Sequence, residues 1–324
     1  MKQFKNILYV NEPNVHQNTA LARAVSLAQS NHADLTVIDV VPTQAVTAGI
    51  GLPLRGQISG ELRAAVESKH RNAMESMLEP FSKRLQIRVE VLIGKTYLEA
   101  IRAVLKSGYD LLIKPAEDPN WTDRLFGSDD LHLLRKCPCP VWLMKPTARP
   151  TFNNILATVD FDLLAPPPFE HELNREILEL SASLALSDIA SLHLVHAWEA
   201  YAERTILSRG GMSSEGMNDY VENTQDRQRE KLYQLAEELR GWLSKESYAR
   251  LDLSFHLPEG PAKKVILPLA TKLQADLVVM GTVARTGIPG IIIGNTAEAI
   301  IDQLSCSVLA IKPPGFETPV KLVE

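Results

Sequence analysis

The apolar residues of this chain fall into short runs of strand length, separated by stretches in which apolar positions recur at helical spacing. In the first half, the runs lie near residues 6–10, 35–41, 86–92, 110–114 and 139–145. The helical stretches are defined by Leu21, Val25 and Ala28, by Met74, Met77, Leu78, Phe81 and Leu85, by Ile101, Val104 and Leu105, and by Leu131 and Leu134. Strands that alternate with helices predict a parallel sheet with helices on both faces.

The second half of the chain repeats the first. Residues 4–8 (FKNIL) reappear 148 positions later as residues 152–156 (FNNIL), and CPVWLMKP at 139–146 corresponds to CSVLAIKP at 306–313. The offset grows to 167 residues along the way because one loop is longer in the second copy. Repeats in solenoids are much shorter, so the pattern indicates two copies of one domain.

The predicted fold is therefore α/β, with two tandem doubly wound domains, each a five-stranded parallel sheet flanked by helices. Residues 1–146 form the first domain, residues 152–313 the second, and residues 314–324 a C-terminal tail. The last strand of each domain has an unpaired edge unless something covers it. We expect these two strands, at 141–145 and 308–312, to meet within one chain as an intramolecular pseudo-dimer.

Composition narrows the class of protein. The chain has 324 residues, of which 45% are hydrophobic and 23% charged, as in soluble globular proteins. No apolar run approaches about 18 residues, and the N-terminus lacks a signal-peptide cleavage site, so we expect neither membrane insertion nor secretion. The net charge of −5 without a basic cluster argues against nucleic acid as the main partner. Three cysteines do not make a disulfide framework, which favours a cytoplasmic location.

A glycine-rich loop in the second copy carries the clearest candidate chemistry. It follows the apolar run at 277–280 and contains Gly281, Gly287, Gly290 and Gly294. We expect Asn295 to open the next helix, with Glu298 three residues later as in a capping box. Glycines let the backbone approach an anion, and the free N–H groups of a helix N-terminus point at its charge. The alternative is a plain strand-to-helix crossover with a long loop.

Each copy also has a glycine-rich segment after its second strand. The segment spans Pro42 to Gly60 in the first copy and Glu199 to Asn218 in the second. Such segments leave the sheet at the strand ends where open α/β sheets bind ligands, so they are either lids or tolerated insertions. We favour insertions.

The second half resembles a domain of the universal stress protein family, and the resemblance extends over both halves, as in the tandem, E-type members. That family's nucleotide motif has a glycine, two residues, a glycine, nine residues, and a glycine followed by Ser or Thr. Gly281 and Gly294 match its first and last glycines. Ala284 replaces the middle glycine, and Asn295 replaces the Ser or Thr.

The resemblance implies a cytoplasmic protein of stress survival, with a fold related to the adenine nucleotide alpha hydrolases. It also implies that the second domain holds ATP or a related adenine nucleotide, which Mg²⁺ can accompany. Asp160, which matches the family's acidic residue at the end of the first strand, and the backbone near Val195 would contact the adenosine. The residues that would contact the phosphates are Gly281, Arg285, Gly294, Asn295 and Thr296.

The first half departs further from this motif. Pro115 stands where Gly281 does, and Asp118 stands where Ala284 does. The acidic position at the end of the first strand is kept as Glu12. Four carboxylates would repel a triphosphate unless a cation intervened, so we interpret this site as lost. They belong to Glu117, Asp118, Asp129 and Asp130.

Other motifs indicate structure rather than chemistry. Gly94-Lys95-Thr96 looks like the end of a Walker A loop, but Val89 stands where that motif needs its first glycine. Cys137 and Cys139 are too few ligands for a metal site and are expected to be buried thiols. His193 and His196, three apart on a strand, face opposite sides of the sheet; His196 can at most border an adenine pocket.

The sequence leaves three functional hypotheses open. No GxSxG, HExxH or GxGxxG motif is present, so we expect no dedicated catalysis and at most slow ATP hydrolysis. The first hypothesis is a nucleotide sensor, and the second is a scaffold with vestigial sites that acts through its dimer surface. The third is a pocket for another small or apolar ligand beneath residues 199–218. Assembly of two chains into a homodimer is left open as well.

Overall fold

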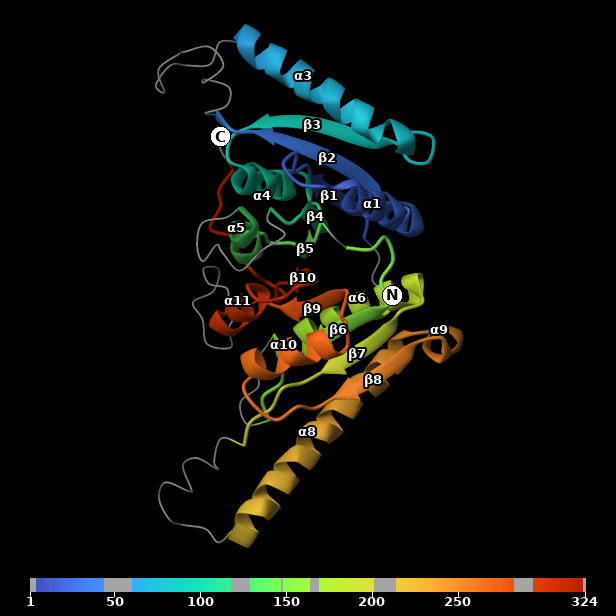
Figure 1. The fold of residues 1–324 in the computed structure, drawn as a ribbon, viewed down its shortest axis with the longest axis vertical. Helices are drawn as coiled ribbons and strands as arrows, with labels where there is room; N and C mark the ends of the chain where they lie inside the picture. The colour runs from blue at the N-terminus through green and yellow to red at the C-terminus, as the bar shows by residue number, and fades with distance from the viewer. Residues whose placement is uncertain are drawn as a thin grey trace.

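One continuous sheet runs through the whole molecule (Figure 1). The computed structural model describes residues 4–43, 60–117, 129–146, 148–163, 169–200, 214–282 and 294–322. Within these residues, ten strands lie in the order β3-β2-β1-β4-β5-β10-β9-β6-β7-β8. The strands are β1 (Asn6–Val10), β2 (Asp34–Val41), β3 (Ile87–Ile93), β4 (Leu111–Pro115), β5 (Val141–Met144), β6 (Asn154–Thr158), β7 (Ser191–Val195), β8 (Asp252–His256), β9 (Leu277–Gly281) and β10 (Ser307–Ile311).

The two halves have the same topology. The first half has the order 3-2-1-4-5, and the second half, read from its own edge, has the equivalent order 8-7-6-9-10. All neighbours within a half are parallel, which confirms the predicted pair of doubly wound, five-stranded domains. The five predicted strands of the first half lie within two residues of the observed ones.

The halves join through their last strands, as predicted. β5 and β10 pair antiparallel, with Leu309 opposite Trp142 and Val308 opposite Leu143. Each strand therefore covers the edge that the other would leave exposed, and the two domains form a pseudo-dimer within one chain. Figure 1 shows this seam at the middle of the molecule, with β3 and β8 at the far edges.

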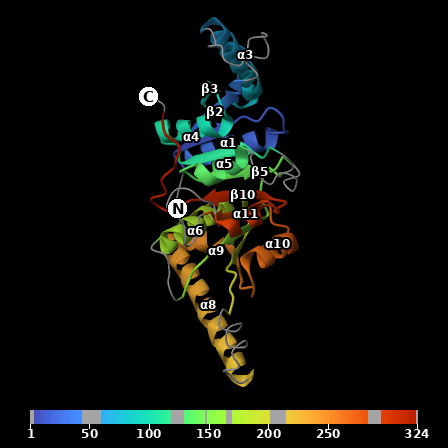
Figure 2. The same cartoon turned by 90° about the vertical axis from the view of Figure 1, so that its left-hand side faces the viewer.

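The helices form two layers, one on each face of the sheet (Figures 1 and 2). One face is covered by α1 (Asn18–Asn31), α3 (Gly60–Leu78), α6 (Glu170–Asp188) and α8 (Ser214–Trp242). The other face is covered by α4 (Thr96–Ser107), α5 (Asp129–Lys136), α10 (Ala262–Lys272) and α11 (Asn295–Ile301). The short helices η1 (Glu79–Phe81) and α9 (Lys245–Ala249) complete the described elements. None of these described helices is both long and apolar enough to cross a membrane.

The two core layers explain why the strands read as nearly continuous apolar runs. In β1, Ile7 and Tyr9 belong to the core beneath α1 and α6, whereas Leu8 and Val10 belong to the core beneath α4 and α10. A parallel strand with helices on both faces buries its odd and even residues alike. The apolar pattern of the sequence follows directly from that burial.

Three local expectations are wrong. The helix predicted to reach Leu85 ends at Leu78, because Pro80 lacks the N–H that would continue it. The segment expected to run from Pro42 to Gly60 ends one residue early, since Gly60 begins α3. The segment expected to run to Asn218 is already helical from Ser214, the first residue of α8. Residues 44–59 and 201–213, which make up most of these two segments, lie outside the described residues.

Two further contacts hold the domains together. Arg23 of α1 donates to Asp188 of α6 at 2.6 Å, and both side chains are almost fully buried. The C-terminal tail leaves β10 and returns along the first domain (Figure 1), where Arg102 of α4 donates to the backbone oxygen of Lys321 at 3.4 Å. Val320 packs into the core beneath α4, so the tail belongs to the packed structure.

Candidate functional site

Asp160, the acidic residue expected to contact an adenosine, lies just after the end of β6. The buried Asn174 of α6 holds its backbone from both sides, because its side chain accepts from the Asp160 N–H at 3.2 Å and donates to the Asp160 C=O at 2.7 Å. The Asp160 carboxylate itself is 62% exposed. The fold thus fixes the backbone at this position and presents the carboxylate to solvent.

A flat aromatic pair lies beside Asp160. The rings of Phe161 and His196 stack with centroids 3.7 Å apart and an interplanar angle of 18°. His196 is buried, and its Nδ1 lies 3.3 Å from the Val159 oxygen and 4.0 Å from Asp160 Oδ1. This pair forms a wall where β6 and β7 end, which is where His196 was expected to border an adenine pocket.

The backbone near Val195 is already engaged in the sheet. The Val195 side chain is fully buried, and its carbonyl accepts the Val159 N–H at 3.0 Å. The next N–H, that of His196, donates to the His256 carbonyl at 3.1 Å. The printed bond uses one of the two lone pairs of the Val195 carbonyl.

The end of β9 and the start of α11 are joined by a single hydrogen bond. The Gly294 N–H donates to the Thr282 carbonyl at 2.8 Å, which closes the neck of the glycine-rich loop. Gly281, Gly294, Asn295 and Thr296 therefore lie together, as the motif requires. The intervening positions, Ala284 and Arg285 among them, lie outside the described residues.

The helix cap differs from the expected one. Gly294 is the N-cap, Asn295 is the first helical residue, and no side chain caps the helix. Glu298 forms an ion pair with Arg135 of α5 instead of closing a capping box. The Gly294 N–H donates to the Thr282 carbonyl, so it is not one of the free N–H groups that a helix N-terminus offers to an anion; the first-turn N–H groups of Asn295 and Thr296 remain as candidates.

Gly294 also has an ordinary backbone. Its φ of −62° and ψ of 135° are accessible to any residue, so no glycine-specific twist is required there. At Gly281, by contrast, the structure gives a reason for glycine, because an added Cβ would lie only 2.9 Å from Cδ2 of Leu173. The case for glycine at position 294 rests on the space that a ligand would need.

A buried lysine contacts Thr282, the residue that follows β9. Lys312 directly follows β10, and its ammonium donates to Thr282 Oγ1 at 2.7 Å and to the Leu134 carbonyl in α5 of the first domain. Its Nζ also lies 4.9 Å from the centre of the Phe316 ring. Burial lowers the pKa of Lys312 to about 7, against a smaller opposing effect of the Cys137 thiol.

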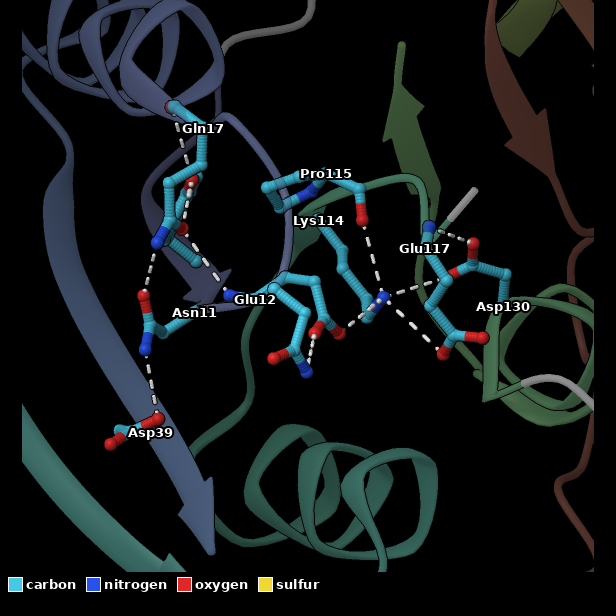
Figure 3. Close-up of polar contacts among 10 residues, drawn as sticks. Asn11, Glu12, Gln17, Asp39, Lys114, Pro115, Glu117 and Asp130 are labelled. Carbon is cyan, nitrogen blue, oxygen red and sulfur yellow. Dashed lines mark hydrogen bonds and ion pairs between the residues drawn. The ribbon is translucent and has the colours of Figure 1, made fainter. Parts of the chain in front are cut away.

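In the first domain, the strand end that corresponds to Met280 and Gly281 of the second is occupied by an ion cluster, which Figure 3 shows. Lys114, at the end of β4, is fully buried. Its Nζ lies 2.8 Å from Asp130 Oδ1, 3.1 Å from Glu12 Oε2 and 3.5 Å from Glu117 Oε1. It also donates to the Pro115 carbonyl at 3.2 Å. We call these four charged residues the Lys114 cluster.

The charges in the Lys114 cluster adjust to one another. Burial alone would lower the pKa of Lys114, but the carboxylates of Asp130, Glu117 and Glu12 outweigh it and hold that pKa above its ordinary value. Burial, together with the charge of Asp130, raises the pKa of Glu117 to about 7. The positive charge that balances these carboxylates is thus that of Lys114, a side chain of the same domain.

Beside the Lys114 cluster, a chain of polar contacts runs from Gln17 to Asp39 (Figure 3). Gln17 donates to Asn11 at 2.7 Å, and Asn11 donates to the buried Asp39 at 2.8 Å. His70 of α3 lies 2.6 Å from the other oxygen of Asp39. Asp39 occupies the place in β2 that corresponds to His196 after β7, so the aromatic wall of the second domain has no counterpart here.

Sequence reasoning missed Lys114 and left Lys312 without a role. The repeat itself held a signal for the first, because Lys114 interrupts an apolar strand at the position where the second copy has Met280. A charged residue at a position predicted to be fully buried needs a partner. The partners could not be identified because they come from three separate segments of the chain.

The cysteine pair and the turn at Gly94 have structural surroundings. Cys137 and Cys139 are buried with their sulfur atoms 3.6 Å apart, and the hydrogen bond between the two thiols together with burial raises the pKa of Cys139. Among the described residues, no group of three or more His, Cys, Asp or Glu side chains is arranged to hold a metal ion. At Gly94, an added Cβ would lie 2.7 Å from the Glu99 side chain, so a carboxylate sits over the turn that resembles a Walker A loop.

Comparison with known proteins agrees with the repeat. The sequence profile of the universal stress protein family matches residues 3–145 and again residues 151–312. Universal stress protein E of Escherichia coli K12 is 29% identical over 326 residues, which cover 99% of this chain and 98% of that protein. The alignment with that protein therefore extends over nearly the whole of both sequences.

Solved structures show the same architecture. A functionally unknown protein from Pseudomonas aeruginosa PAO1 superposes with a TM-score of 0.63 at 27% identity, covering 96% of this chain and 93% of the other. A universal stress protein from Archaeoglobus fulgidus superposes with a TM-score of 0.63 at 15% identity, covering 97% of this chain and 98% of the other. The second likeness concerns the fold alone.

Proposed function

The chain belongs to the universal stress protein family, and we propose that it is a cytoplasmic stress-response sensor that binds ATP or a related adenine nucleotide in its second domain only. One observation carries the proposal: the two equivalent sites differ at the end of the fourth strand of each domain, β4 in the first and β9 in the second. In the first domain, Lys114 fills this place together with three carboxylates. In the second, the place belongs to Met280, and the strand end carries no such cluster among the described residues.

The first domain repels a nucleotide for two reasons. The Lys114 cluster contains three carboxylates and one ammonium, so it stays net negative even though Glu117 titrates near neutrality. A triphosphate would also have to displace Lys114 contacts as short as 2.8 Å. Breaking a buried ion pair of this kind costs about 3–5 kcal/mol, which a typical phosphate contact does not return.

The second domain offers separate places for the parts of a nucleotide. The exposed carboxylate of Asp160 can accept hydrogen bonds from ribose hydroxyls, and the stacked His196–Phe161 pair and the backbone near Val195 lie beside it. The phosphates would lie against Gly281 and Gly294, with donors from Arg285 and from the first turn of α11 at Asn295 and Thr296. Mg²⁺ would accompany the phosphates through their own oxygens.

Stoichiometry tests the proposal. Titration of the full chain with a fluorescent ATP analogue, followed by calorimetry with ATP and Mg²⁺, should give one site per chain. Denaturing the purified protein and searching the supernatant by mass spectrometry should release an adenine nucleotide. Two sites of similar affinity would contradict the asymmetry. Absence of any binding would reject the nucleotide and favour a scaffold that acts through its surface.

A further inference from the structure

Two histidine rings meet between β7 and the edge strand β8. Nδ1 of His193 lies 3.1 Å from Nε2 of His256, and the ring centroids are 5.2 Å apart. Within the described residues, β8 pairs with β7 alone, so this contact lies at the outer edge of the sheet. Both histidines are half-buried, which leaves them accessible to a small solute.

The register of the strands places both rings on the same face of the sheet. His193 lies between Leu192 and Leu194, which belong to the core beneath α6, so its ring points to the opposite face, beneath α10. His256 pairs with Val195, whose side chain belongs to the core beneath α10. The two imidazoles therefore come together on the α10 face from neighbouring strands.

Asn154 of β6 determines which nitrogen of His193 carries the proton. Nε2 of His193 lies 3.5 Å from the side-chain oxygen of Asn154. An amide oxygen only accepts, so the proton is on Nε2, and Nδ1 keeps its lone pair toward His256. The 3.1 Å contact is then a hydrogen bond from Nε2–H of His256 to Nδ1 of His193. His193 thus presents a lone pair, as a neutral imidazole does when it binds a metal.

The distance between the two nitrogens suits a shared metal ion. Nitrogen ligands bind Zn²⁺ at about 2.0–2.1 Å, so two of them in a tetrahedral sphere lie about 3.3 Å apart. At an angle of about 90°, as in tetragonal Cu²⁺ or Ni²⁺ sites, similar bond lengths separate them by about 2.9 Å. The observed 3.1 Å lies between these values. A metal ion could replace the bridging proton, which would move to Nδ1 of His256, a nitrogen without another partner among the described residues.

We propose that His193 and His256 bind a divalent transition-metal ion of the Zn²⁺, Ni²⁺ or Cu²⁺ class, which joins the edge strand β8 to β7. Asn154 is a positioning residue, because it orients the ring of His193 as hydrogen-bond acceptors orient metal-ligating histidines in general. In the part of the chain that the structure describes, no three His, Cys, Asp or Glu side chains converge, so water completes the coordination. The ion is therefore exchangeable, unlike that of a closed structural zinc site.

The charges around the pair favour neutral imidazoles. Burial lowers the pKa of His193, and Asp252 of β8 opposes this shift only in part. Burial also lowers the pKa of His256, together with the charges of His193 and of Lys272 in α10. A proton therefore competes little with a metal ion near pH 7.5. Because Lys272 also repels a bound cation, Lys272→Gln should tighten metal binding.

The first domain has no such pair, although its strands are equivalent. Thr36 of β2 occupies the place of His193, and Glu90 of β3 occupies the place of His256. The proposed site therefore belongs to the second domain alone. Because the same strand accepts threonine in the first domain, His193→Thr is a substitution that the fold should tolerate.

Calorimetry of the full chain with Zn²⁺, without a polyhistidine tag and without nucleotide, tests the proposal. Zn²⁺ does no redox chemistry with the cysteine thiols. Near pH 7.5 we expect one site per chain, which is lost in His193→Thr and in His256→Gln. Asn154→Ala should bind roughly tenfold or more weakly, because it frees the ring of His193. The matched control is His171→Gln, which removes an exposed histidine paired with Glu238 and should bind like wild type.

Two further measurements locate the ion. Anomalous diffraction at the zinc edge from soaked crystals should show a peak between the two rings. Hydrogen exchange of the β8 amides, residues 252–256, should slow with Zn²⁺ in wild type and not in His193→Thr, because a ligand stabilises the state that binds it.

The outcomes decide the proposal. Binding that survives in both variants of the pair, or that is lost in His171→Gln instead, would mean an adventitious ion only, and the proposal would be wrong. Absence of Zn²⁺ binding to wild type would reject the site as well. If circular dichroism shows that a variant of the pair does not fold, the position of the anomalous peak in wild-type crystals decides.

Discussion

Replacing Lys114 by methionine should destabilise the first domain strongly and in a pH-dependent way. Methionine is the residue that the second domain has at this position, Met280, so the strand itself tolerates its shape. The substitution removes the ammonium and leaves three carboxylates, whose side chains are 7%, 13% and 18% exposed, facing one another. The effect is therefore one of charge, with little change in packing.

The magnitude follows from the distances. The three carboxylate oxygens lie 2.8, 3.1 and 3.5 Å from Nζ. At an effective dielectric constant of about 20, each such contact corresponds to about 5 kcal/mol of attraction, most of which offsets the cost of burying the charges. Removing one partner of a buried pair typically costs about 3–5 kcal/mol, and we expect a loss of that size near pH 8.

The loss should shrink as the pH falls. Without the ammonium, the folded variant binds protons on its carboxylates more tightly than the unfolded chain does. Stability then rises toward low pH and decreases as the pH increases, which is the reverse of an ordinary paired carboxylate. Near pH 5 the remaining groups can share protons, and the variant should recover most of its stability.

Urea unfolding near pH 8 and near pH 5 measures the effect. A matched variant that combines Lys114→Met with Glu117→Gln and Asp130→Asn should regain most of the stability near pH 8, because it removes the repulsion along with the cation. A loss below about 1 kcal/mol near pH 8, or an equal loss at both pH values, would refute the electrostatic reasoning.

Three other predictions concern single residues. Burial and the charge of Asp130 raise the pKa of Glu117 from 4.5 to about 7, so this group stabilises the fold at low pH and its contribution is lost as the pH rises to about 7. Glu117→Gln should therefore flatten the dependence of the melting temperature on pH in this range, and an unchanged slope would contradict the prediction. Gly294→Val should abolish binding of a fluorescent ATP analogue by filling the space before α11, whereas Gly127→Val, at the position of the first domain that corresponds to Gly294, should change it little; equal affinities of the two variants would reject the assignment. Asp188→Asn should cost about 3 kcal/mol in chemical unfolding by leaving Arg23 buried without a counter-charge, and a neutral result would show that the ion pair is dispensable.

The architecture could be read from the sequence because burial imposes it. A strand between two helical layers is buried on both faces and is apolar at most positions, so runs such as Leu111–Ile113 and Leu277–Met280 stand out from the amphipathic helices around them. The repeat then fixed the number of domains and brought equivalent strands into correspondence. The pairing of β5 with β10 followed because each would otherwise have exposed an edge.

Local detail at the site was less accessible. Asn295 and Glu298 have the types and spacing of a capping box, yet Gly294 is the cap and Glu298 pairs with Arg135, a residue 163 positions away. A capping box is a local rule, and a partner from the other domain overrides it. The Gly294 N–H is likewise engaged by a residue outside the helix, since Thr282 accepts it across the neck of the loop.

By itself, the sequence determined the α/β class, the duplication and the place of the glycine-rich loop, because each follows from the order and pattern of residue types along the chain. Only the tertiary structure decided what charge each site carries. Lys114 gathers carboxylates from residues 12, 117 and 130, and Lys312 meets its partners at residues 134 and 282. Electrostatic energy depends on distance in space and on burial, and neither quantity exists until the chain has folded.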